Sequence, residues 1–252
     1  EIGTIKAASA TCPACGTSTK PDDVRTYGKK MGFGAQLYAV CDIEGKHRRY
    51  RVPTPTEVDG ALVEAAHRLA SLPDLEDGTS AVPDETITKS QFRILRSLVY
   101  GIDTFTELFN VRQRFVLGRL ARGVREMHAL MLSEGLDPDY ARALATYLGF
   151  VVDRAADYNS TFCGWSVSRE GVRNTFPRQA IAMVWDYMEI DPMGDGPGNF
   201  SGAVRWIELA LRHCSASASI PATVVRGNAQ SLPFDDGEFD AVITDQIGRA
   251  HV

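Results

Sequence analysis

Residues 227–245 read Gly-Asn-Ala-Gln-Ser-Leu-Pro-Phe-Asp-Asp-Gly-Glu-Phe-Asp-Ala-Val-Ile-Thr-Asp, and this stretch decides the predicted fold class. Residues 222–226 before it and residues 239–244 within it are apolar and rich in β-branched side chains, which is typical of parallel strands covered on both faces. Ligands of such sheets bind at the carboxyl ends of the strands. Because Asn228 and Asp245 follow the two predicted strands, we expect them on the same rim of an α/β sheet.

Upstream of this stretch, the sequence predicts the rest of an α/β domain over residues 161–245 and a helical region over residues 57–160. Residues 181–188 predict a buried strand, and Ser201 is the expected cap of a helix after the Gly/Pro-rich loop 191–199. In the helical region, apolar residues recur at helical spacing after the candidate cap Thr56 and along residues 105–132. Asp137 followed by Pro138 predicts the start of another helix.

Residues 1–56 predict a small β module with a metal-binding turn. Cys12-Pro-Ala-Cys15-Gly16 has the spacing of a zinc knuckle, in which two thiolates reach one tetrahedral metal, so Cys12 and Cys15 are expected to form half of a structural zinc site. We expect the second pair of ligands upstream of Glu1. Completion of the site by Cys41 and His47 is an alternative, although Cys41 in an apolar run also fits a buried core thiol. A redox dithiol is the other functional interpretation.

Composition and charge narrow the possible partners. The 252 residues are 44% hydrophobic and 23% charged, which is ordinary for a globular protein. No apolar run has the length of a membrane span and no leader is recognised, so we expect a cytoplasmic protein without a membrane partner. Because the net charge is −5, DNA contacts would need local basic patches. Arg112, Arg119 and Arg122 form one candidate patch for phosphates, with a solvated helix face as the alternative.

Both ends of the sequence predict a piece of a longer reading frame. Glu1 stands where an initiator Met is expected. Residues 246–252, Gln-Ile-Gly-Arg-Ala-His-Val, match the translation of a common sequencing adapter, so we expect a non-biological scar there and exclude it from the fold. A genuine short C-terminus is the alternative.

The segment at residues 227–245 resembles the third and fourth motifs of Rossmann-like S-adenosylmethionine methyltransferases. The carriers of the resemblance are the polar residue Asn228 at a strand end, the Leu-Pro-Phe turn at 232–234 and the Asp-x-Val-x-x-Asp strand that ends at Asp245. The resemblance implies that Asn228 bonds the cofactor adenine, although an acid is common at that position in the family. Asp186, near the end of the predicted strand 181–188, and Glu189, directly after it, would hold the cofactor ribose, with solvated acids as the alternative.

The whole chain resembles adenine-specific DNA methylases that contain a zinc ribbon (the DUF1156 family), from about Thr11 to Asp245. The segments that carry this resemblance are Thr-Cys-Pro-Ala-Cys-Gly at 11–16, Tyr-Arg-Val-Pro-Thr at 50–54, Val-Pro-Asp-Glu at 82–85, Phe-Thr-Glu-Leu-Phe-Asn-Val-Arg-Gln at 105–113, Asp-Tyr-Asn-Ser at 157–160, Asn-Thr-Phe-Pro-Arg-Gln-Ala at 174–180 and Met-Val-Trp-Asp-Tyr-Met-Glu at 183–189. The implied fold is a partial Rossmann-like methyltransferase sheet with a zinc-ribbon-like β module and a helical insert.

The family resemblance also implies a reaction and its partners. Asp245 would open an Asp-Pro-Pro-Tyr motif that orients the amino group of a base flipped out of double-stranded DNA. Here Gln246-Ile247-Gly248 follow instead, so we expect this fragment to be inactive although its parent transfers methyl groups, with restriction or anti-phage proteins as possible partners. Arg178 and Gln179 would contact DNA, or else cap a helix or lie at the surface.

Three functions therefore remain open. The first is the parent DNA methyltransferase, with adenine N6 as target and cytosine N4 not excluded by any residue. The second is a non-catalytic zinc-ribbon protein that binds DNA or acts as a scaffold, supported by the knuckle and by the basic residues 46–51. The third is a small-molecule methyltransferase, which leaves the ribbon and the helical insert without a purpose.

Overall fold

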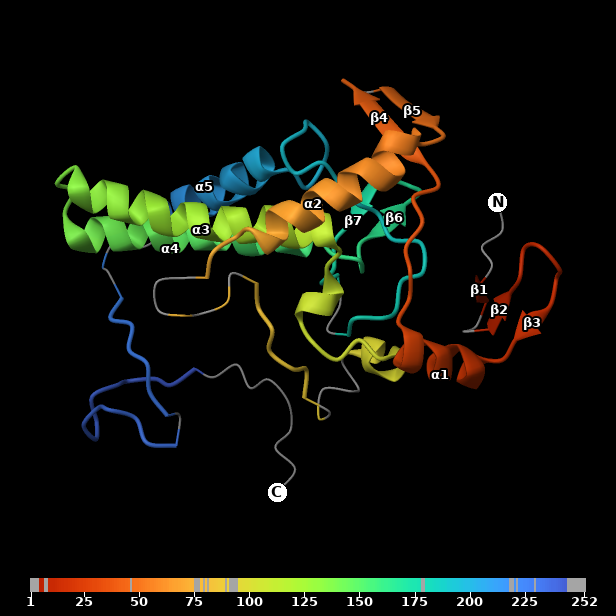
Figure 1. Ribbon diagram of the computed structural model, residues 1–252. Coiled ribbons are helices and arrows are strands. Elements are labelled where there is room, and N and C mark those ends of the chain that lie inside the picture. Colours follow the sequence, from red (N-terminus) through yellow and green to blue (C-terminus); the bar gives the residue numbers. More distant parts are fainter. Residues whose placement is uncertain are drawn as a thin grey trace. The chain divides into compact units, whose positions relative to one another are not determined.

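The structure, a computed structural model, combines helices with small antiparallel sheets (Figure 1). It describes residues 5–6, 9–45, 47–74, 78, 80, 82–88, 90, 95–177, 180–217, 220, 222–228 and 230–243. The chain divides into two compact units, Glu1–Leu211 and Arg212–Val252. This arrangement confirms a mixed α and β protein.

Two long helices, α3 (Val111–Ser133) and α4 (Pro138–Asp157), lie side by side in the first unit (Figure 1). The sequence sets their ends locally. Gly135 adopts a φ of 83°, which permits the turn after α3, and the side chain of Asp137 accepts a hydrogen bond from the Tyr140 N–H at the start of α4. The predicted break at Gly135 and the predicted start at Asp137 are both confirmed.

The remaining helical elements of the described residues are all shorter than α3 and α4. They are α1 (Pro21–Met31), the π-helical turn η1 (Thr56–Gly60) that leads into α2 (Ala61–Ala70), the 3₁₀ turns η3 (Arg96–Tyr100) and η4 (Thr106–Leu108), and α5 (Phe200–Ser217).

Three helix starts differ from the predictions by a few residues. Thr54, not Thr56, forms the capping box: its N–H donates to Glu57 Oε2, and the Glu57 N–H donates to Thr54 Oγ1. The Asn199 side chain, not that of Ser201, accepts the Gly202 N–H at 2.8 Å before α5. Residues 105–110 lie outside α3, because the η4 turn precedes it.

The described strands form three small antiparallel sheets. The first sheet has the order β1 (Ile5–Lys6), β2 (Ser9–Thr11) and β3 (Ser18–Thr19). The second pairs β4 (Val40–Glu44) with β5 (His47–Arg51), and the third pairs β6 (Gly164–Ser166) with β7 (Gly171–Arg173). The predicted N-terminal β module thus consists of two separate sheets with α1 between them in the sequence.

The parallel strands of the predicted Rossmann-like sheet are not seen in the described residues. Residues 222–228 and 230–243 contain only an isolated bridge between Asn228 and Ser231, and in residues 181–188 only Ile181 makes a bridge, to Leu95. A parallel strand needs neighbouring strands and covering helices to pair its backbone and bury its side chains. Val224 and Ile243 are instead 90% and 96% exposed, so these apolar side chains are not packed against the described residues. Asp245 and residues 246–252, for which the sequence predicts a scar, lie outside the described residues.

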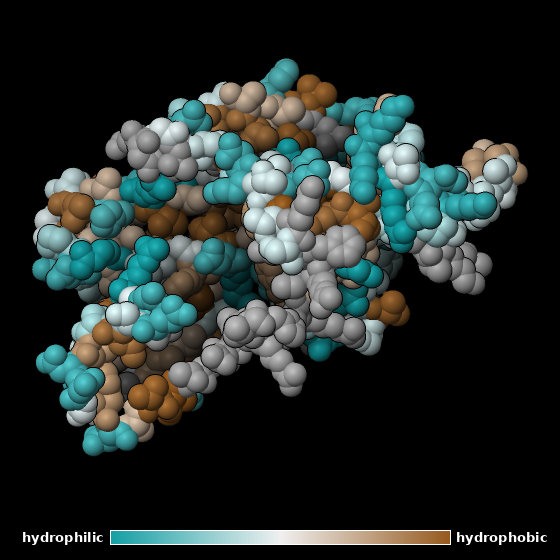
Figure 2. Space-filling model, turned by 90° about the horizontal axis from the view of Figure 1, so that it is seen from below, coloured by the Kyte–Doolittle hydropathy of each residue, from teal (hydrophilic) through white to brown (hydrophobic). Residues whose placement is uncertain are grey.

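A small core joins η4 to the segment that follows α4. Its members are Ile87, Leu95, Leu108, Phe162 and Ile181. The backbone N–H of Thr161 donates to the carbonyl of Leu108 at 2.9 Å, so the chain before α3 and the chain after α4 are held together. Elsewhere many apolar side chains stay exposed, as the brown residues among the teal ones in Figure 2 show. In the described part of the chain, none of the helices has the length and apolar character that a membrane crossing requires.

Candidate functional site

A bidentate ion pair between Arg112 and Glu189 lies at the start of α3. Arg112 Nε donates to Glu189 Oε1 at 2.7 Å, and Arg112 Nη2 donates to Glu189 Oε2 at 2.6 Å. The two side chains are only 24% and 23% exposed, and the hydrogen bonds to Glu189 raise the pKa of Arg112. A planar guanidinium that meets a carboxylate in this way is held in one orientation.

Asn110 completes the surroundings of this ion pair and also caps α3. Its Nδ2 donates to Glu189 Oε2 at 2.7 Å and to the Tyr187 hydroxyl at 3.2 Å. Its Oδ1 accepts the backbone N–H of Gln113, whose Oε1 in turn accepts the backbone N–H of Asn110. This capping box fixes the side chain of Gln113 as well as the helix end.

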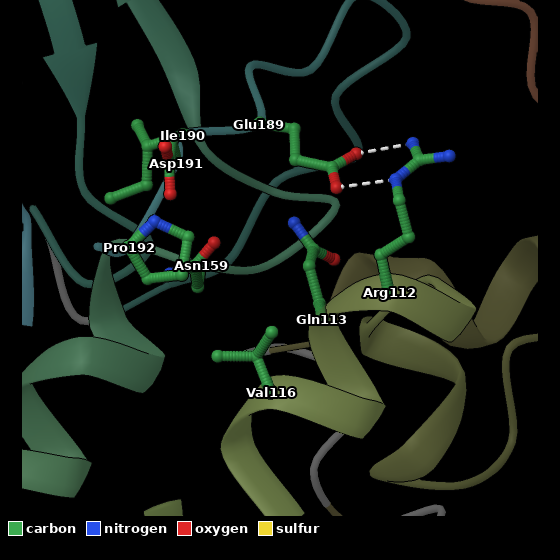
Figure 3. A pocket seen from close by; sticks show the side chains of 8 residues that line it. All are labelled: Arg112, Gln113, Val116, Asn159, Glu189, Ile190, Asp191 and Pro192. Carbon is green, nitrogen blue, oxygen red and sulfur yellow. Dashed lines mark hydrogen bonds and ion pairs between the residues drawn. The ribbon is translucent and has the colours of Figure 1, made fainter. Parts of the chain in front are cut away.

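A pocket of about 210 Å³ opens beside the ion pair (Figure 3). Arg112, Gln113 and Val116 line it from α3, Asn159 lines it from the turn after α4, and residues 189–192 close the opposite side. The three segments are far apart in the sequence, so only the tertiary fold creates this site.

Two buried amides of the pocket retain unused hydrogen-bond donors. Gln113 and Asn159 are each 2% exposed. Within the described residues, neither Gln113 Nε2 nor Asn159 Nδ2 has a hydrogen-bond partner. Buried polar groups in folded proteins are nearly always paired, so these two donors are exceptions. Both nitrogens are buried although the pocket is open, so neither faces its open space.

The position of Asn159 is fixed by a network around Asp157. Asp157 accepts hydrogen bonds from Asn174 Nδ2 at 2.8 Å and from the Phe176 N–H at 2.9 Å, and its carbonyl accepts the Thr175 hydroxyl at 2.7 Å. Thr175 and Ser160 are buried and share a hydrogen bond of 2.7 Å. Residues 157–160 are thereby joined to residues 174–176, and the turn that presents Asn159 is held on both sides.

The pocket is lined by residues for which the sequence predicted different roles. Arg112 was predicted to contact DNA and Glu189 to hold a ribose, yet each is the partner of the other. The segments 105–113, 157–160 and 183–189, all carriers of the family resemblance, also meet here. Sequence reasoning missed Asn110, Gln113 and Asn159. The Asn-x-x-Gln spacing of a capping box could have indicated the first two, whereas no local pattern marks Asn159.

The other predicted DNA contacts lie elsewhere. Arg122 donates to Glu126 at 3.2 Å and to the carbonyl of Pro73 at 2.9 Å, and Arg119 lies 3.9 Å from the same carboxylate. Glu126 therefore reduces the positive charge of this helix face. Arg178 and Gln179 lie outside the described residues.

The residues predicted to bind the cofactor are divided between the two units, Asp186 and Glu189 in the first and Asn228 in the second. Asp186 is exposed and is not among the residues that line the pocket. Asn228, in the second unit, is exposed, and its Oδ1 accepts the backbone N–H of Gln230 at 3.0 Å. In the same unit, Phe234 and Phe239 pack edge to face with ring centroids 4.9 Å apart, which stabilises the turn between them.

Cys12 and Cys15 lie in the turn between β2 and β3 and are both exposed. The Gly16 N–H donates to the Cys12 carbonyl and the Cys12 N–H to the Thr17 carbonyl, each at 2.9 Å, and Gly16 has a φ of 72°. Cys15 Sγ and Thr17 Oγ1 lie 3.2 Å apart, and the side-chain and backbone hydrogen bonds of Thr17 to the ionised sulfur lower the pKa of Cys15. A lower pKa favours the thiolate, the form that binds a metal.

No third metal ligand joins this cysteine pair within the described residues, where no group of three or more His, Cys, Asp or Glu side chains could hold a metal ion. Cys41 lies on β4, half-buried and paired with Tyr50 on β5. The described part of the chain therefore does not assemble the alternative site of Cys12, Cys15, Cys41 and His47.

Comparisons with known proteins yield no relative of this chain. A scan against models of protein families, a search of curated proteins and a search of solved structures each found no match.

Proposed function

We propose that this chain is part of an S-adenosylmethionine-dependent DNA amino-methyltransferase that acts on adenine N6, with cytosine N4 as the other possible target. The observation that carries the proposal is the sequence at 227–245, where a strand-like run, Asn228, the Leu-Pro-Phe turn and Asp245 follow in the order of the methyltransferase motifs. As part of the same proposal, the methyltransferase domain forms a Rossmann-like sheet, and the protein lies in the cytoplasm, where DNA and the cofactor are available.

Asp245 is the residue we assign to the reacting amino group. An exocyclic amino group is a poor nucleophile, and a carboxylate that accepts one of its N–H bonds turns the nitrogen lone pair toward the methyl donor. S-adenosylmethionine would supply the methyl group from its sulfonium. A target base must first leave the duplex to reach such a site.

We assign the cofactor contacts to those polar side-chain atoms that are not already engaged within the protein. Asn228 uses its Oδ1 within its own turn, so its Nδ2 is the atom that would donate to a ring nitrogen of the cofactor adenine. Asp186 is exposed and suits a ribose hydroxyl. Glu189 already accepts hydrogen bonds from Arg112 and Asn110 and is better suited to hold the pocket than to bind ribose.

DNA and zinc are the further partners in this proposal. Arg119, which is 47% exposed, and Arg122 would meet phosphates, and Cys12 with Cys15 would hold one half of a structural zinc site. The knuckle-like turn and the lowered pKa of Cys15 also favour the second candidate, a non-catalytic zinc-ribbon protein that binds DNA. Proteins of a restriction or anti-phage system are the expected cellular partners of the methyltransferase.

Methyl transfer by the complete gene product tests the proposal. The gene that contains this reading frame is expressed, and transfer of tritium from labelled S-adenosylmethionine to duplex DNA is measured. We expect transfer to adenine, with loss of at least about a hundredfold in Asp245→Ala. Zinc and DNA binding without any methyl transfer, in wild type as in Asp245→Ala, would favour the zinc-ribbon protein instead.

A further inference from the structure

We propose that the exposed side of α4 is an interface between two copies of this chain, which pack against each other with their α4 helices antiparallel. This interface does not depend on the proposed function, because the apolar side chains and the charges of α4 define it. It gives a partner to a surface that neither the methyltransferase motif nor the cysteine pair uses.

Large aromatic side chains form a row on the exposed side of α4. Tyr140, Tyr147 and Phe150 are 58%, 38% and 48% exposed, and the small, exposed Ala143 lies between the first two. These four residues, the aromatic row, recur every three or four residues and therefore share one side of the helix. The rings of Tyr147 and Phe150 contact each other with centroids 6.0 Å apart. Aromatic surface gathered in this way is typical of protein interfaces.

Trp206 of α5 extends the row at one end. It is 60% exposed, and the guanidinium of Arg154 lies 4.7 Å from the centroid of its ring. Arg154 follows Phe150 by four residues and so lies on the same side of α4. In an antiparallel pair, Trp206 of one copy would approach the end of the row that carries Tyr140 in the other copy.

The charges of α4 favour a second copy as the partner. Asp139 and Arg142 lie eight and five residues before Tyr147. Asp153 and Arg154 lie six and seven residues after it. When two α4 helices run antiparallel about a centre near Tyr147, each acidic residue of one copy therefore lies opposite a basic residue of the other. A parallel pair would bring like charges together, so the pattern selects the antiparallel arrangement.

Arg142 and Asp153 cannot pair within one copy. They are eleven residues apart on the same helix, which separates them by about 16 Å along its axis. Arg142 instead donates to Asp139 at 2.7 Å, with side chains 72% and 82% exposed. Such a surface pair contributes little stability, so Arg142 remains accessible to a carboxylate of another copy.

The size of this surface predicts a weak, reversible dimer. Aromatic side chains have about 150–250 Å² each, so the exposed parts of the four rings amount to about 300–500 Å² per copy. Two copies would bury about 600–1,000 Å² of aromatic surface, which is at the low end for specific interfaces. A dissociation constant on the order of 10–100 μM is therefore expected.

Sedimentation velocity of the full chain tests this interface directly. The weight-average mass is measured from about 5 to 500 μM, a range that brackets the expected dissociation constant. It should rise with concentration toward twice the mass of one chain. A chain that stays single at every concentration would overturn the proposal and leave the aromatic row to another segment of the complete gene product.

A charge exchange tests the antiparallel arrangement. Arg142→Asp and Asp153→Arg each place like charges across the interface and should weaken association about tenfold. The double variant restores opposite charges between copies and should associate within about threefold of wild type. Because these residues are too far apart to compensate within one helix, recovery can arise only between two copies. A double variant that associates no more tightly than the single variants would contradict the arrangement.

A matched pair of tyrosine variants locates the interface on the aromatic row. Tyr147→Ser removes the central ring and should weaken association at least about tenfold. Tyr38→Ser makes the same change at a position that is 65% exposed and outside α4, and should associate like wild type. Circular dichroism verifies that both variants fold. Wild-type association of Tyr147→Ser, or an equal loss in both variants, would contradict the proposed interface.

Discussion

Arg112 and Glu189, 77 residues apart in the sequence, form a bidentate ion pair with N–O distances of 2.7 and 2.6 Å. The pair joins the first turn of α3 to the segment that closes the candidate pocket. Because both side chains are about three-quarters buried, little water is available to replace either partner. The ion pair is therefore a structural support of the pocket.

Glu189→Gln should lower the free energy of unfolding by about 1–3 kcal/mol, because Arg112 would keep its charge in a largely buried position without a carboxylate. Arg112→Lys should also destabilise, since an ammonium cannot reproduce the two parallel hydrogen bonds. Urea denaturation measures both effects. The exposed pair of Arg142 and Asp139, with side chains 72% and 82% exposed, is the control, and Asp139→Asn should change stability by less than about 1 kcal/mol. Equal effects at the two pairs would show that Arg112 and Glu189 do not support the fold.

Asn110 contributes to stability both as a helix cap and as a donor to Glu189. Asn110→Ala removes both roles and should cost about 1–2 kcal/mol in the free energy of unfolding. Asn110→Ser retains a capping oxygen but loses the amide that donates to Glu189 at 2.7 Å, so its cost should be smaller. Thermal denaturation of the two variants separates the roles, and a serine variant as unstable as the alanine variant would argue against a contribution from capping.

The ionisation of Glu57 makes the free energy of unfolding depend on pH in the acidic range. Hydrogen bonds from Arg51, then from the backbone and side chain of Thr54, lower the pKa of Glu57 from 4.5 to about 2. The folded state therefore favours the ionised form, so this contribution is complete above about pH 4.5 and is lost as the pH falls toward 2. Glu57→Gln should reduce the difference in stability between pH 5 and pH 2 that urea denaturation measures. The matched change Glu64→Gln, at an exposed pair with Arg68, should leave that difference in place.

Thr17 should control the reactivity of Cys15. Its hydrogen bonds lower the pKa of Cys15, so Thr17→Val should raise that pKa toward 9.0 and slow alkylation by iodoacetamide severalfold at neutral pH. Mass spectrometry of the peptide that contains Cys15 follows the rate. The exposed Cys214 on α5 serves as an internal reference whose rate should not change. An unaltered rate at Cys15 would mean that Thr17 does not stabilise the thiolate.

The helical part of the fold was the most predictable, because its signals are local. Asp137 followed by Pro138 marks the start of α4, which begins at Pro138, and Gly135 supplies the positive φ after α3. The start of α3 was placed too early, because apolar residues continue through the η4 turn before the true cap at Asn110. Local chemistry thus located these helices, and competing local signals explain the errors at their ends.

The sheet and the pocket depend on partners distant in the sequence, and spacing cannot reveal these. The β-branched runs at 222–226 and 239–243 are suited to strands, but the described residues provide no neighbouring strand with which they could pair. Arg112 was recognised as a functional candidate from its basic neighbours, whereas its actual partner Glu189 became visible only in the folded chain. No sequence pattern around Asn159 marks it as a site residue. It is a candidate only because the fold buries its side chain beside the pocket.

Sequencing of the source DNA across the codon for Asp245 tests the central claim most directly. The methyltransferase assignment requires Asp245 to begin an Asp-Pro-Pro-Tyr motif, and residues 246–248 read Gln-Ile-Gly in this sequence. We predict that codons for Pro-Pro-Tyr follow Asp245 in the natural gene. A natural gene that encodes Gln-Ile-Gly at these positions would contradict the catalytic assignment and leave the zinc-ribbon DNA-binding protein as the better account.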